Sequence, residues 1–101
     1  MGTGDATAPG PGSVLVLGRG ELHRGERFGP GTVCRGALLM GCEWDGGVVE
    51  SGVLAGCLFR SGEFRGGTFF GGVFLGGRWA GGRWENGFDA SGRYRPRGSP
   101  P

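Results

Sequence analysis

The sequence predicts an all-β repeat fold, and composition and periodicity are the observations that predict it. Glycine makes up 27 of the 101 residues, yet 37% of the chain is hydrophobic and 11% is aromatic. Disordered chains hold fewer apolar residues than this, so we expect the glycine to serve a repetitive fold. A pattern of five residues recurs through the second half of the chain. A helix would scatter the aromatic residues of such a pattern around its surface, and glycine at this density would destabilise it.

The repeat is clearest in the eleven five-residue units that run from Met40 to Tyr94. The fifth position is apolar or aromatic in ten of these eleven units, with Asp89 as the exception, and the third position is glycine in nine. The second position is always Gly, Ser or Asn. Such fixed self-similarity is typical of a repeat architecture in which each unit stacks on its neighbours.

Each unit fits a very short strand. Side chains alternate along an extended chain, so the third and fifth positions point to the same side. The large fifth residue is expected to fill the interior, while the glycine two positions earlier leaves room for it and the small second residue bends the chain. The residues predicted to form this core ladder are Trp44, Phe59, Phe64, Phe69, Phe74, Trp79 and Trp84.

This pattern resembles that of the pentapeptide-repeat proteins, whose unit has a central Leu or Phe with a small residue two positions earlier. The resemblance covers residues 35–94 and implies a right-handed quadrilateral β-helix, a β-solenoid in which four units form each coil. Residues four units apart would then stack, and the repeat would form about three coils. The chain departs from the family in using Gly where Ala is usual and in lacking Asp or Asn before the central residue. The alternative is an antiparallel meander like that of MORN repeats, which the segment GRWENG at 82–87 resembles.

The chain is expected to divide into a repeat and its flanking segments. Residues 1–12 are rich in Gly, Pro and Thr and are predicted to be flexible. Residues 13–34 hold a short apolar run and a polar stretch, which we interpret as a capping strand and loop. The β-solenoid is predicted over 35–94, and 95–101 is predicted to be a disordered tail.

An apolar outer face is the basis of the functional prediction. With four units in each coil, Val33, Val53 and Val73 would form one outward column, and Leu38 would stack on Leu58. Exposed apolar patches of this kind usually mark an interface, although a terminal segment could also cover the patch. We therefore predict a non-enzymatic structural or protein-interaction scaffold that forms a homodimer or docks a protein partner. The predicted interface residues are Val33, Leu38, Val53, Leu58, Phe70, Val73 and Leu75.

The alternative function is a nucleic-acid-binding module. It would use the arginines of the last repeats and of the tail, with Trp79 and Trp84 for stacking on bases. The net charge of only +2 and the inward direction expected for both tryptophans make a nucleic-acid partner the less favoured alternative. The arginines concerned are Arg78, Arg83, Arg93, Arg95 and Arg97.

Other function classes find little support, and no catalytic, cofactor-binding or metal-ligating residues are predicted. His23 is the only histidine, and no arrangement of Ser, His and an acid is recognisable. The three cysteines include no CxxC motif, which argues against a zinc ribbon or a disulfide framework and favours free thiols in the cytoplasm. The N-terminus does not resemble a signal peptide, and the apolar run at 14–17 is too short to span a membrane. We therefore expect neither enzymatic activity, nor a cofactor, nor a membrane partner.

Overall fold

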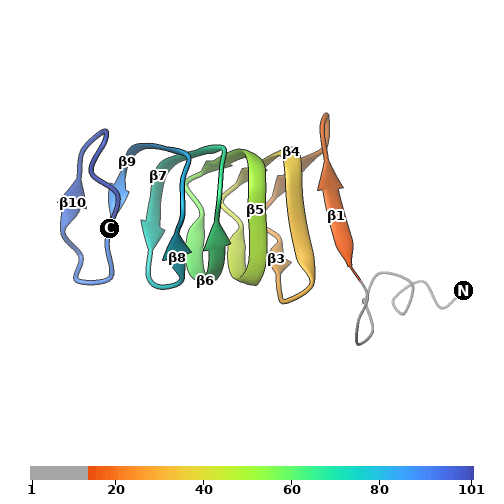
Figure 1. Ribbon diagram of the computed structural model, residues 1–101, viewed down its shortest axis with the longest axis horizontal. Coiled ribbons are helices and arrows are strands. Elements are labelled where there is room, and N and C mark those ends of the chain that lie inside the picture. Colours follow the sequence, from red (N-terminus) through yellow and green to blue (C-terminus); the bar gives the residue numbers. More distant parts are fainter. Residues whose placement is uncertain (1–13) are drawn as a thin grey trace, which may run out of the picture.

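The computed structural model describes residues 14–101, which form a β-solenoid, a stack of coils built from short strands (Figure 1). Alternating inward and outward side chains and frequent glycine corners favour short strands at every unit of the repeat. The ten strands are β1 (Leu15–Gly18), β2 (Leu22–Arg24), β3 (Arg27–Phe28), β4 (Thr32–Met40), β5 (Glu43–Ala55), β6 (Leu58–Phe64), β7 (Thr68–Phe74), β8 (Arg78–Trp79), β9 (Arg83–Phe88) and β10 (Tyr94–Arg95).

The strands pair side by side in parallel, coil upon coil. The sheet runs in the order β1-β4-β5-β6-β7-β9-β10, with β2 on β4, β3 on β5 and β8 on β6. Long strands such as β5 continue around a corner and so pair with more than one neighbour. Only β9 and β10 pair in antiparallel fashion among the described residues. The alternative of a MORN-like antiparallel meander is therefore wrong.

Each coil consists of three five-residue units, because each residue stacks on the one that lies three units earlier in the chain. Leu39 pairs with Leu54, Leu54 with Phe69, and Phe69 with Trp84. The four-unit stacking and the quadrilateral coil that the pentapeptide resemblance implied are therefore wrong. With shorter coils the chain completes about five turns rather than the expected three.

Glycine at the corners allows the tighter winding. A coil of three units must bend more at each corner than a coil of four, and the left-handed conformation of Gly52 (φ 116°) and of Gly56 (φ 64°) supplies such bends. The neighbouring coil also lies very close at Gly52. A Cβ atom on Gly52 would lie 2.5 Å from the carbonyl oxygen of Ala37, which occupies the same position in the preceding coil.

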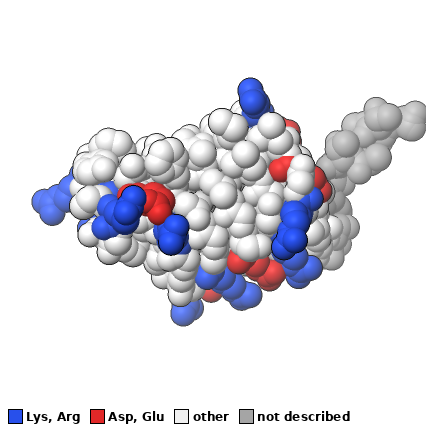
Figure 2. Space-filling model, turned by 90° about the horizontal axis from the view of Figure 1, so that it is seen from above, with Lys and Arg blue, Asp and Glu red and all other residues white. Residues whose placement is uncertain are grey.

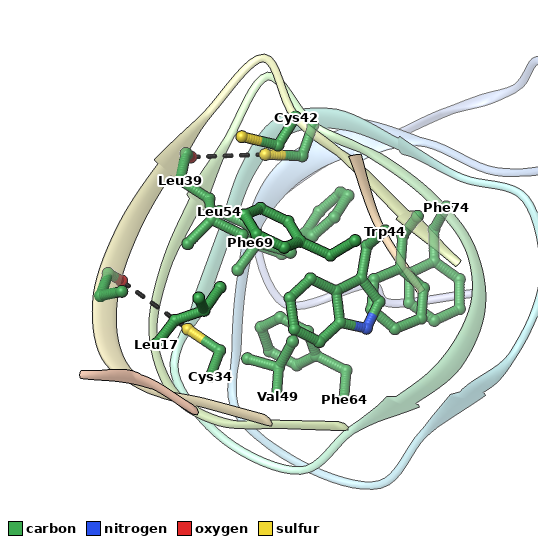
Figure 3. Close-up of a cluster of buried hydrophobic side chains, with 14 of the residues drawn as sticks. Leu17, Cys34, Leu39, Cys42, Trp44, Val49, Leu54, Phe64, Phe69 and Phe74 are labelled. Carbon is green, nitrogen blue, oxygen red and sulfur yellow. Dashed lines mark hydrogen bonds between the residues drawn. The ribbon is translucent and has the colours of Figure 1, made fainter. Parts of the chain in front are cut away.

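Three inward columns of side chains fill the solenoid (Figure 3). Six of the seven predicted core residues are buried, whereas Trp79 is half-buried against the end of the core. Rings of successive coils stack face to face within a column: the ring centroids of Phe64 and Trp79 are 4.4 Å apart, and those of Phe59 and Phe74 are 4.6 Å apart. Rings of neighbouring columns meet edge to face. The columns are Leu17–Cys34–Val49–Phe64–Trp79, His23–Leu39–Leu54–Phe69–Trp84 and Phe28–Trp44–Phe59–Phe74.

The stack begins earlier in the chain than the repeat does. Within the segment that was interpreted as a capping strand and loop, β1, β2 and β3 together form a complete first coil. Its Leu17 pairs with Cys34, and its Phe28 pairs with Trp44. Both pairs are further apart in the chain than three five-residue units, so the first coil is longer than the others. Residues 1–12, which were predicted to be flexible, lie outside the described part of the chain.

The C-terminal end is closed by a turn around Asp89. This residue follows Phe88, the partner of Val73, and so occupies the position above Phe74 in its column. Its carboxylate accepts hydrogen bonds from the main chain and hydroxyl of Ser91, from the main chain of Arg93 and from the Arg95 side chain. These bonds hold the pKa of Asp89 well below its usual range. A charged, hydrogen-bonded side chain at this position ends the apolar column.

Residues 95–101, which were predicted to be a disordered tail, instead fold back against the last coil. The indole nitrogen of Trp84 donates a hydrogen bond to the carbonyl of Arg95, at 3.0 Å. The main-chain nitrogen of Gly98 donates to the carbonyl of Trp84, at 2.9 Å. The side chain of Arg97 reaches Glu85.

Candidate interaction surface

Outward-facing residues divide the solenoid into three sides, one for each unit of the coil. Because side chains alternate, the residues immediately before and after each inward residue point outward together. The register stacks these outward residues in columns that run from coil to coil, with small shifts at the corners. The chemistry of each side can therefore be read coil by coil. Figure 2 shows one face on which uncharged residues cover the middle, while charged side chains lie mainly towards its margins.

The first side carries mainly charged residues. Arg35 forms an ion pair with Glu50 at 2.8 Å, and Arg65 lies 3.2 Å from Glu63 and 4.0 Å from Glu50. The pairs that Glu50 forms connect successive coils. The side chains are between about a quarter and three fifths exposed, and such pairs contribute roughly 0–1 kcal/mol each. We call this surface the charged side; it comprises Val33, Arg35, Val48, Glu50, Glu63, Arg65, Arg78 and Ala80.

The second side is uncharged through the three central coils. Leu38, Val53 and Thr68 form one column, in which each residue pairs with the next. Met40, Ala55 and Phe70 form the column beside it in the same way. Three of these side chains are well exposed: Phe70 at 50%, Met40 at 39% and Leu38 at 37%. We call this surface the apolar side; it comprises Leu38, Met40, Val53, Ala55, Thr68 and Phe70.

The third side changes character along the solenoid. Glu43 lies near its N-terminal end and forms ion pairs with Arg27 and Arg60, at 3.5 and 2.7 Å. Towards the C-terminal end the same column continues with Leu58, Val73 and Phe88. This apolar half joins the apolar side across the corner formed by glycines and cysteines at 41–42, 56–57 and 71–72.

The structure separates the predicted interface residues among all three sides. Val33 lies on the charged side, where it pairs with Val48. The predicted columns Val33–Val53–Val73 and Leu38–Leu58 are therefore wrong, because they assumed four units in each coil. The remaining residues still lie on adjoining surfaces: Leu38, Val53 and Phe70 on the apolar side, and Leu58, Val73 and Leu75 on the third side.

Sequence reasoning missed two exposed apolar residues: Met40 on the apolar side and Phe88 on the third side. Met40 and Phe70 lie two coils apart in one column, separated by Ala55. Phe88 lies one coil beyond Val73 and is 42% exposed. A count of apolar residues at a spacing of three units would have found both.

His23 is held between two carboxylates at the N-terminal end of the solenoid. Its ring nitrogens lie 2.9 Å from Glu21 Oε1 and 3.0 Å from Glu26 Oε2. The hydrogen bond to Glu21, together with that to Glu26, raises the pKa of His23. A protonated imidazole that donates to both neighbours satisfies this arrangement. Among residues 14–101, no group of three or more His, Cys, Asp or Glu residues could hold a metal ion.

The three cysteines are buried free thiols. Cys42 donates a hydrogen bond to the carbonyl of His23, and Cys57 to that of Leu39. Burial raises the pKa of the Cys57 thiol to about 11 and also raises the pKa of Cys34. Cys34 and Cys57 are therefore protonated at neutral pH, and thiols in this form are poor nucleophiles and metal ligands.

Most arginines of the nucleic-acid alternative are engaged by acids. Arg83 and Arg97 both form ion pairs with Glu85, at 3.4 and 3.0 Å, and Arg95 pairs with Asp89 at 3.0 Å. Trp79 and Trp84, which were expected to stack on bases, instead stack on aromatic residues of the core. Trp84 is buried and stacks on Phe69, and Trp79 stacks on Phe64.

Comparisons with protein-family models, with curated proteins and with solved structures find no match for this chain. Within residues 14–101, no helix has the length and hydrophobicity that crossing a membrane would require.

Proposed function

We propose that this protein is a non-enzymatic scaffold that associates with a second copy, or docks another protein, through the apolar side. The observation that carries the proposal is the row of uncharged outward residues across three successive coils. Six residues in two adjoining columns, from Leu38 to Phe70, form this row. The sheet beneath them is held by parallel hydrogen bonding and a packed aromatic core, so the surface is preorganised for binding.

Several features support this proposal over the alternatives. The ion pairs of Arg83, Arg95 and Arg97 reduce the charge that the nucleic-acid-binding alternative needs. The hydrogen-bonded state of His23 and the protonated thiols of Cys34 and Cys57 favour a structural role over catalysis. Free buried thiols also suit a reducing compartment, and we propose the cytoplasm. The right-handed winding implied by the pentapeptide-repeat resemblance stays a prediction.

The test is the mass of the protein in solution at micromolar concentrations, measured by light scattering. The variant with both Leu38→Arg and Phe70→Arg places two charges on the apolar side. Both residues are more than a third exposed, so the arginines can reach water and the fold should persist. We expect the wild-type chain to be larger than its 10.4 kDa monomer and the variant to have a lower mass than the wild type at the same concentration.

The matched control carries Val33→Arg and Ala80→Arg, which add the same two charges to the charged side. Both proteins should keep the circular dichroism spectrum of the wild type. A double variant on the apolar side that keeps the wild-type mass would contradict self-association through this surface. Loss of association in the control alone would assign the contact to the charged side instead.

A further inference from the structure

The two ends of the solenoid differ in how their strand edges are treated. At the C-terminal end, β10 turns back and pairs with β9, so that Tyr94 lies opposite Phe88 and Arg95 opposite Gly87. Asp89 and its hydrogen bonds fix this turn. An antiparallel strand across the last coil prevents another parallel coil from continuing the stack there.

At the N-terminal end, the first coil pairs on one edge only. Its strands β1, β2 and β3 pair with β4 and β5, and within residues 14–101 no strand pairs with their other edge. The main-chain nitrogen of Leu15 donates to the carbonyl of Gly31, at 2.8 Å. In a parallel pair, alternate residues bond to the same neighbour, so the N–H and C=O groups of Val16 point away from the stack.

Several exposed side chains at this end are apolar, beside the charged Glu21 and Glu26. Val14 is 62% exposed, Val16 44% and Leu22 49%. Behind them, Leu17 and Phe28 form the last layer of the core. They line a shallow depression together with Leu15, Val16, His23 and the charged residues Glu21, Glu26 and Arg27. An open edge with exposed apolar side chains is the arrangement that favours pairing with another strand.

We propose that the N-terminal end of this solenoid pairs with the same end of a second copy through antiparallel contact of the two β1 strands. A closed C-terminal end excludes head-to-tail stacking, which would give an open filament, and leaves a closed twofold dimer. A twofold axis requires each strand to meet itself in antiparallel direction. With four residues, β1 is the longest strand of the first coil, and Val16 of one copy would lie opposite Val16 of the other.

The size of the end face sets the strength of this contact. The two shorter extents of the molecule are 26 and 22 Å, so two facing ends bury at most about 1,100 Å² in total, close to the lower limit of specific interfaces. Main-chain hydrogen bonds across the paired edges add to this small area. We therefore expect a dimer that dissociates on dilution within the micromolar range.

The experiment uses the full chain in which Leu38→Arg and Phe70→Arg already block the apolar side, so that only the end contact is measured. Light scattering over a range of concentrations should give a mass that rises from 10.4 kDa towards twice that value. Adding Val16→Pro should abolish this rise, because proline removes the outward N–H group without breaking a bond to β4. The control Val16→Thr keeps both the N–H group and the branched shape, and it should dimerise like its parent.

A second readout does not depend on the proline variant. In the wild-type chain, hydrogen exchange at the Val16 amide should slow as the protein concentration rises, while exchange at exposed turn amides should not change. A mass of 10.4 kDa at every concentration in the blocked background, or exchange at Val16 that is independent of concentration, would overturn the end contact. Neither result would affect the proposed role of the apolar side, because that role is tested by the wild-type mass and its own double variant.

Discussion

In eight of the nine units with glycine at the third position, that glycine lies directly against the main chain of the coil beneath it. A Cβ atom on Gly67 would lie 2.5 Å from the carbonyl oxygen of Gly52, and the backbone of Gly67 has a φ of 98°. Both facts exclude a larger residue. From the sequence, we expected this glycine to leave room for the aromatic ring two positions later. At Gly67 the close contact between successive coils is the stronger constraint.

Gly67→Ala should lower the free energy of unfolding by at least about 1–3 kcal/mol, the range for a non-glycine residue in a sparsely populated backbone region. The clash with Gly52 adds to this loss. Gly29→Ala is the control: Gly29 has no positive φ, and its added Cβ would lie 3.8 Å from the nearest atom, an ordinary contact. Urea unfolding of the two variants gives the comparison. Equal midpoints would mean that the third position does not lie against the neighbouring coil.

Strand by strand, the five-residue pattern predicted most of the buried side chains of the repeat, with Trp79 and Tyr94 as exceptions at the fifth position. Alternation alone places Phe64 and Phe69 inside, and both are completely buried. The pattern could not predict the number of units in a coil. Three or four units give the same alternation of inward and outward side chains, and the difference lies in how sharply each corner bends. The choice of four units came from the family resemblance, and it misplaced every outward column of the candidate site.

Phe69 and Phe70 are adjacent in β7 and give a direct test of the inward and outward assignment. Phe69 is fully buried and stacks on Trp84 with ring centroids 4.9 Å apart, whereas Phe70 is 50% exposed. Phe69→Ala should lower the free energy of unfolding by roughly 3–5 kcal/mol. Phe70→Ala should change it by only about 0.5 kcal/mol, as is usual for surface positions. Urea denaturation followed by tryptophan fluorescence measures both, and similar losses would contradict the assignment.

The whole molecule combines a regular interior with an uneven exterior. One side is charged, one is apolar, and the third changes from charged to apolar along the solenoid. The N-terminal end is open and the C-terminal end is closed. The sequence indicated an apolar outer face, but it did not predict the closed end. Asp89 could have indicated the closed end, because it is the one charged residue at the fifth position between Met40 and Tyr94. It ends an inward column and does not interrupt one.

The first coil could not be recognised because its length conceals the repeat. It contains one extra residue between Leu17 and Leu22, since the first pairs with Cys34 and the second with Leu38. A second extra residue lies between Phe28 and Cys34, since Phe28 pairs with Trp44 whereas Cys34 pairs with Val49 at the regular offset of three units. Each insertion shifts the five-residue frame while leaving the stacking intact. Corners tolerate such insertions because their main chain takes less part in the pairing.

The nuclear Overhauser contacts of the Val53 methyl groups test the three-unit coil most directly. Val53 is flanked by Leu38 and Thr68 in a three-unit coil, whereas a four-unit coil would place it between Val33 and Val73. We predict strong contacts from Val53 to Leu38 and Thr68, and none to Val33 or Val73. Contacts from Val53 to Val33 and Val73, without those to Leu38 and Thr68, would contradict the three-unit coil and with it the apolar side.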